Sequence, residues 1–88
     1  MDMEFTKVTT QAELDVAIAD NRLRIEIAAA VILEAKIPDG LTMVLKTVAG
    51  AWLRLFAGKV EAWESSHVEA RGSSHVEARG SSHVVAWG

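Results

Sequence analysis

The chain has 88 residues with one proline, and this length suits a single small domain, residues 1–88. Nine Lys and Arg against twelve Asp and Glu give a formal charge of -3, which argues against a phosphate-binding surface and so against direct binding of nucleic acid. The absence of cysteine excludes disulfides, thiolate catalysis and cysteine-ligated metals. No apolar run reaches membrane-spanning length, so we expect a cytoplasmic protein with no membrane partner.

The first predicted element is a helix from Thr10 to Asp20, inside an N-terminal capping segment of residues 1–21. Thr10-Gln11-Ala12-Glu13 has the form of a capping box, in which the threonine hydroxyl accepts from the Glu13 amide and the glutamate reaches back. Asp20-Asn21 is typical of a left-handed helix stop. A helix this short is marginal alone, so we expect it to cover apolar surface. Its apolar face carries Leu14, Ala17 and Ile18.

Residues 22–55 contain four runs in which apolar and polar side chains alternate, the pattern of strands with one buried side. Pro38-Asp39-Gly40 predicts a turn between the second and third runs, because proline sets φ and glycine takes a positive φ. The apolar side chains here are large, so we expect degenerate strands around a wider core. The four runs are Leu23, Ile25 and Ile27; Val31 to Ile37; Leu41, Met43 and Leu45; and Ala51, Leu53 and Leu55.

Residues 56–88 form an octapeptide repeat. After FAGKVEAW the chain reads ESSHVEAR, GSSHVEAR and GSSHVVAW, followed by Gly88. An even period fits a strand and conflicts with a helix, because eight residues at about 100° each leave successive copies about 80° out of phase. The third, fifth and seventh positions are expected to face inward, as Ser74, Val76 and Ala78 do in the middle copy. The Gly-Ser pairs at residues 72–73 and 80–81 are expected to form corners, so that each octad is one strand and one turn.

Strands of this kind bury their small apolar face only by stacking, which predicts a mostly β protein, a small single-chain β-solenoid with an N-terminal capping α-helix. Two octads per coil give sixteen residues and about four coils from Arg22 onward; three octads, twenty-four residues, are the alternative. Sixteen residues place Trp63 over Arg79 and Arg71 over Trp87, whereas twenty-four place Trp63 over Trp87. We favour sixteen, because an aromatic ring beside a guanidinium is a favourable pair. The same interval stacks Glu61 over Glu77, which is an unfavourable pair of like charges.

The octads GSSHVEAR and GSSHVVAW resemble the octapeptide arrays of bacterial and phage β-solenoid proteins. They are more loosely similar to ice-nucleation repeats, whose octapeptide opens with Gly-Ser-Thr and whose coil has sixteen residues. Here His75, Glu77 and Arg79 stand in place of outward threonine rows, so ice activity is not expected. An octad repeat is also similar to the trimeric β-helix of phage tail spikes, but Ala78 stands where that pattern has glycine.

No catalytic, cofactor-binding or metal site is predicted, and we expect a non-enzymatic protein without a cofactor. An interval of sixteen puts His67 and His83 on one face and His75 on the other, so one chain does not converge three ligands. A metal shared between subunits is the remaining alternative. The serines repeat as copies and do not form a nucleophile with its base and an orienting group.

The function predicted from these features is that of a scaffold or protein-interaction module. The sequence stops at Gly88 after a complete octad, so either two ends meet in a homodimer or the sequence is a shortened piece of a longer array; either favours self-association. One protein partner is also compatible, with exposed tryptophans acting as anchors or only covering neighbouring strands. The alternative is a phage-type inhibitor that docks on a nucleic-acid-handling host enzyme by duplex mimicry. The candidate interaction residues are Trp52, Trp63, Arg71, His75, Arg79, His83 and Trp87.

Overall fold

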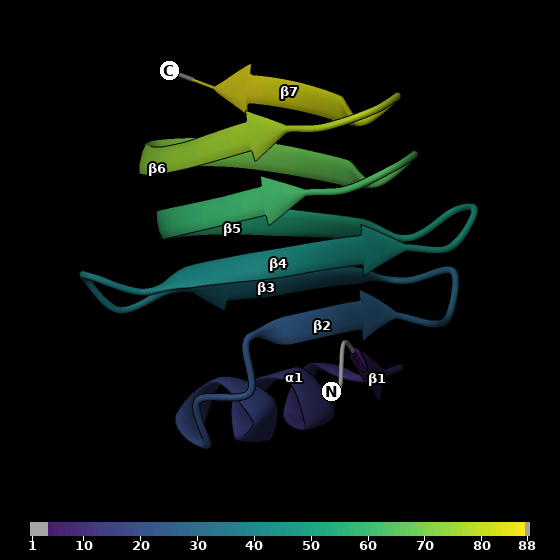
Figure 1. The fold of residues 1–88 in the computed structure, drawn as a ribbon, viewed down its shortest axis with the longest axis vertical. Helices are drawn as coiled ribbons and strands as arrows, with labels where there is room; N and C mark the ends of the chain where they lie inside the picture. The colour runs from purple at the N-terminus through teal and green to yellow at the C-terminus, as the bar shows by residue number, and fades with distance from the viewer. Residues whose placement is uncertain (1–3, 88) are drawn as a thin grey trace.

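The computed structural model describes residues 4–87 as a stack of short parallel strands with one helix beneath it (Figure 1). The mostly β class with a single short helix is confirmed for this part of the chain. No helix in it is long and apolar enough to cross a membrane. The elements are β1 (Thr6–Val8), α1 (Gln11–Ala19), β2 (Arg24–Ile27), β3 (Ile32–Lys36), β4 (Thr42–Thr47), β5 (Trp52–Ala62), β6 (His67–Ala78) and β7 (His83–Trp87).

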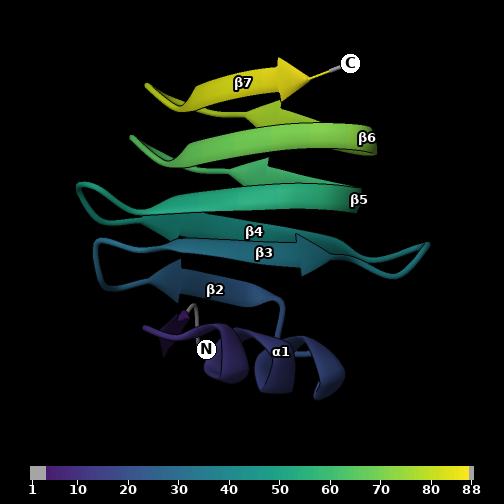
Figure 2. The same ribbon diagram turned by 180° about the vertical axis from the view of Figure 1, so that it is seen from behind.

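The seven strands belong to one sheet in which every pairing is parallel. The first half of β5 pairs with β3 and its second half with β4, so the sheet folds over in the middle of β5, and again in the middle of β6. Figures 1 and 2 show the two resulting rows of strands, one behind the other. We call the outer side of β3, residues 52–57, residues 67–71 and β7 face A. Face B is the outer side of β2, β4, residues 59–62 and residues 73–78.

The interval between paired strands changes along the stack. Arg24 pairs with Val44 and Ile32 with Trp52, both twenty residues on. In the octads, by contrast, His67 pairs with His83, sixteen residues on, as predicted and in preference to twenty-four. A uniform interval of sixteen from Arg22 onward is therefore wrong. The physical reason is that the early connections around residues 38–41 and 48–51 are loops, which add residues that the octad corners do not need.

The two Gly-Ser corners of the octads differ from each other. Gly80-Ser81 forms a turn, as expected, but residues 72–73 lie inside the continuous strand β6, so one turn per octad is wrong. There the pairing between β5 and β6 shifts register, and Gly72 takes a φ of 62°, which bends the strand around the edge of the stack. At the turns, serine hydroxyls satisfy the backbone: Ser82 Oγ lies 3.0 Å from Ala62 O and 2.6 Å from Arg79 O.

The side chains that fill the interior become smaller from the helix toward β7. Large ones fill the first strands and small ones the octads, as the sequence predicts. The inward positions of the octads keep the predicted alternation, but only the first copy is well covered: Val68 is fully buried, Val76 is partly buried and Val84 is 39% exposed. The larger buried side chains are Ile25, Ile27, Leu33, Met43, Leu45, Leu53 and Leu55.

Helix α1 begins and ends where the sequence predicts. Thr10 is its N-cap and accepts from Glu13 N at 3.2 Å, and Asn21 takes the left-handed conformation after the last turn, with φ 59°. The second half of the capping box is displaced, because Glu13 Oε1 accepts from Thr9 N at 2.6 Å instead of reaching the Thr10 amide. Leu14 and Ala17 are buried against the strands, as expected of a cap. Strand β1, which precedes the helix, was not predicted; its Val8 is buried beside β2.

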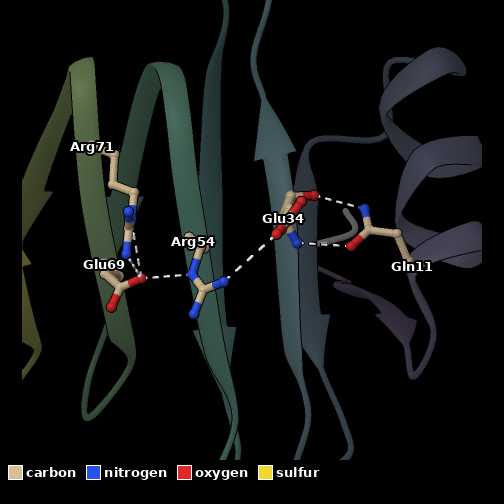
Figure 3. Close-up of polar contacts among 5 residues, drawn as sticks. All are labelled: Gln11, Glu34, Arg54, Glu69 and Arg71. Atoms are coloured by element: carbon tan, nitrogen blue, oxygen red, sulfur yellow. Dashed lines mark hydrogen bonds and ion pairs between the residues drawn. The ribbon is translucent and has the colours of Figure 1, made fainter.

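The cap closes the lower edge of β3 with a side chain. Gln11 Oε1 accepts from Glu34 N at 2.8 Å, and Gln11 Nε2 donates to Glu34 O at 2.7 Å (Figure 3). One amide group thus bonds both backbone groups of a strand residue, as the backbone of a neighbouring strand would do. Asp15 Oδ1 accepts the other Nε2 hydrogen at 2.9 Å and holds the amide in this orientation.

Replacing Gln11 should weaken the fold at this edge. We expect Gln11→Ala to lower the free energy of unfolding by about 1 kcal/mol, since two hydrogen bonds to Glu34 are lost at a partly solvated site. Gln11→Glu should be at least as destabilising as Gln11→Ala, because a carboxylate oxygen would replace Nε2 beside two acceptors, Glu34 O and the negatively charged Asp15 carboxylate. Urea denaturation followed by circular dichroism measures this. Equal stability of all three proteins would contradict a role in closing the edge.

Glu64 occupies a backbone conformation that favours glycine. It aligns with Gly72 and Gly80 in the repeat and has a φ of 59°. We expect Glu64→Gly to raise the free energy of unfolding by up to about 1 kcal/mol, because relief of the left-handed strain exceeds the added entropy of the unfolded chain. The matched control, Gly80→Ala, should destabilise, because a Cβ there would lie 3.3 Å from Glu64 Cα at a φ of 64°. A lower melting temperature for Glu64→Gly would refute the argument.

Candidate functional site

The predicted interaction residues do not gather at one place. They divide between the two opposite outer faces of the stack, so each face is a separate candidate surface. Trp87 pairs in register with Arg71 of β6, and its side chain lies outside the described part of the structure. On face A are Trp52, Arg71, His83 and Trp87. On face B are His75 and, directly after residues 59–62 and 73–78, Trp63 and Arg79, whose amides bond Leu45 O and Ala62 O.

A column of three rings runs along face A; we call it the ring column. The His67 ring lies 4.8 Å from the Trp52 ring at 52°, and the His83 ring stacks on it at 4.8 Å and 7°. This confirms that His67 and His83 share a face, with His75 on the other. Within residues 4–87 no group of three or more His, Cys, Asp or Glu side chains is placed to hold a metal ion.

Beside the ring column, face A carries a ladder of charges of alternating sign. Arg54 Nε donates to Glu69 Oε1 at 2.6 Å, and its Nη1 lies 3.6 Å from Glu34 Oε2 (Figure 3). Arg71 Nη2 approaches the same Glu69 oxygen at 3.3 Å. One guanidinium thus bridges carboxylates on the strands below and above, which offsets the repulsion that a row of like charges would cause.

These contacts change the acidity of Glu69. Its pKa lies below the ordinary value of 4.5, first because the Arg54 guanidinium donates a hydrogen bond to the carboxylate, and further because Arg54 and Arg71 are positive. Burial acts in the opposite direction, less strongly than the Arg54 hydrogen bond, and the pKa of Glu69 remains lowered. Glu69 is therefore ionised in the folded chain at neutral pH, and its charge is matched by cations on either side.

Face B holds a second cluster, around Glu61. The Trp63 indole Nε1 donates to Glu61 Oε1 at 2.9 Å, and Arg79 Nη2 lies 2.9 Å from Glu61 Oε2. The indole hydrogen bond is the first cause of the lowered pKa of Glu61, with Arg79 adding to it. Glu61 pairs in register with Glu77, as predicted, and Arg79 lies 4.0 Å from Glu77 Oε1, so it relieves the like-charge stack.

The guanidinium of Arg79 thus binds carboxylates, whereas the sequence suggested that it would lie against Trp63. A carboxylate within reach is the stronger partner for an exposed guanidinium. The half-buried Trp63 ring is instead covered by Phe5, edge to face at 6.2 Å, and Lys46 Nζ lies 4.9 Å from the Phe5 ring centre. In residues 4–87 the Trp63 ring therefore packs against Phe5.

The stack has an open end, formed by residues 73–78 and β7. In residues 4–87 no strand pairs with the outer edge of either segment. Side chains that point to the interior are consequently uncovered: Val84 is 39% exposed, and Ala78 and Ala86 are exposed too. On face A, Val85 is 40% exposed and lines a shallow hollow together with Ile32, Trp52, Arg54 and Glu69.

Sequence reasoning missed the charge ladder Glu34–Arg54–Glu69. Its members are separated by twenty and then fifteen residues, so an eight-residue period does not align them. The alternation within the strands could have identified them. Each of the three residues directly follows an inward residue, and its place along the strand can be counted from the turn before that strand. Gln11 was likewise seen only as part of the capping box.

Neither a protein-family model, nor a curated protein, nor a solved structure matches the chain.

Glu69 should make stability depend on pH. Because its pKa is lower in the folded chain than the ordinary 4.5, its contribution is present above that value and disappears as the pH falls through the lower, folded pKa. We expect Glu69→Gln to melt at a lower temperature than the parent at neutral pH and the difference to vanish in acid. The matched control is Glu77→Gln, because the Glu77 side chain is 65% exposed and its carboxylate lies 4.0 Å from Arg79 Nη2; it should show a smaller effect. A pH-independent difference for Glu69→Gln would contradict the assignment.

Proposed function

We propose that this chain is a β-solenoid that acts as a non-enzymatic protein-interaction module and associates with itself through its open end. The solenoid is supported by the constant interval in the octads, where residues 59–62 pair with 75–78 and residues 67–71 with 83–87. Like residues lie over like residues on the inward side, which is the geometry of stacked rungs.

The contrast between the two ends carries the functional proposal. At the lower end α1 covers the core and Gln11 satisfies the edge of β3. At the open end, unpaired strand edges and uncovered Val84 stand together, and both favour pairing with another chain. The helix blocks the opposite end, so association through the open end gives a closed dimer and not a filament.

A non-enzymatic role is supported by the arrangement of the polar side chains. The ionised groups are spread along two opposite faces and engage one another, as Glu69 does with Arg54 and Glu61 with Arg79. A catalytic centre needs a nucleophile, a base and an orienting group converging on one point. Paired charges also favour an interaction module over duplex mimicry, since a duplex mimic needs rows of uncompensated negative charge.

The proposal predicts a concentration-dependent dimer. Sedimentation equilibrium and light scattering over a wide concentration range should give a mass that rises from that of one chain to that of two and then stays constant. A mass of one chain at every concentration would overturn self-association, and a mass that grows without limit would overturn the closed dimer.

A further inference from the structure

We infer that the second copy docks with its β7 antiparallel to β7 of the first, about a two-fold axis that passes beside Val85. This inference rests on the proposed self-association and specifies its geometry. The occupant of the open end is then a second copy of this chain, and each Val85 lies opposite Val85 of the second copy.

The hydrogen-bonding groups of the β7 backbone are oriented for this pairing. His83 N donates to Ser66 O at 2.8 Å, so the backbone groups of His83, and of Val85 two residues on, turn toward β6. The N–H and C=O of Val84 and Ala86 consequently point out of the open edge. β7 has five residues with Val85 at its midpoint, so a two-fold axis there pairs the whole strand. Val84 and Ala86 of the second copy then exchange both of their hydrogen bonds.

The repeat departs from its own pattern at the residue on the axis. The sixth octad position is Glu61, Glu69 and Glu77 in the first three copies and Val85 in the last. Residues opposite each other in an antiparallel pair that is not hydrogen-bonded lie about 4.5 Å apart at Cα, so glutamate at this place would face its own symmetry copy. Like charges directly opposite are destabilising, whereas two valines pack.

The second strand segment at the open end, residues 73–78, is compatible with the same two-fold axis. Val85 comes four residues after Ser81 and Val76 four residues before Gly80, so the two valines lie equally far from the turn, on opposite rows. Strand edges that meet about Val76 would bring His75 opposite Glu77 of the second copy, where an imidazole N–H can donate to the carboxylate. On the inward side Val84 of one copy lies opposite Ala86 of the other, and these apolar side chains cover the interior at the open end.

Restoring the repeat residue tests the axis. We expect Val85→Glu to raise the dissociation constant of the dimer by about tenfold, because it places two carboxylates face to face. Val85 points outward and is 40% exposed, so the monomer should keep its circular dichroism spectrum. The matched control is Ile32→Glu, which adds the same charge at a 55% exposed position of face A, on the strand three places below β7, and should leave the dimer unchanged.

A cysteine at the axis gives an independent measurement. The chain has no cysteine, so Val85→Cys introduces a single thiol, and mild oxidation should convert it to a disulfide-linked dimer, while Ile32→Cys should stay unlinked. Dissociation by Val85→Glu together with cross-linking of Val85→Cys supports the geometry. A dimer that survives Val85→Glu and does not cross-link overturns this geometry and leaves self-association standing on another surface. A parent protein that is a single chain at every concentration overturns both.

Discussion

Parallel backbone pairing is the constraint on which the rest of this structure depends. In the octads the paired residues are sixteen apart, so on the inward side valine pairs with valine and alanine with alanine, as Val68 does with Val84 and Ala70 with Ala86. The same constraint would stack like charges on the outside. Arg54 and Arg79 relieve that repulsion by reaching carboxylates on neighbouring strands.

The two ends of the stack meet the problem of unpaired strand edges in different ways. At the lower end the Gln11 amide acts as a strand backbone toward Glu34, and α1 lies over the apolar interior. At the other end, no strand of residues 4–87 pairs with the outer edge of β7, and Val84 is 39% exposed. The two ends therefore differ: a side chain satisfies the strand edge beside the helix, and no group of residues 4–87 does so in the same way at β7.

The outer faces carry different chemistry on the same framework. Face A has stacked rings of Trp52, His67 and His83 beside a ladder of alternating charges, and face B has Trp63 covered by Phe5. Val85 lies where the ladder of face A ends, over Glu69. Thus the last octad has an apolar side chain at the position where the three earlier copies have glutamate.

Local pattern in the sequence was sufficient to identify the helix, the strand alternation and the sixteen-residue interval, because capping, periodicity two and repetition act between near neighbours. The early twenty-residue interval, the bend at Gly72 and strand β1 were decided by tertiary structure, since they depend on how much chain each corner needs to bring strands into register. The contacts Gln11–Glu34, Arg54–Glu69 and Phe5–Trp63 arise only from that register. Which residues of adjacent strands lie side by side depends on the number of residues in each corner. The alternation of side chains within a strand carries no information about that number.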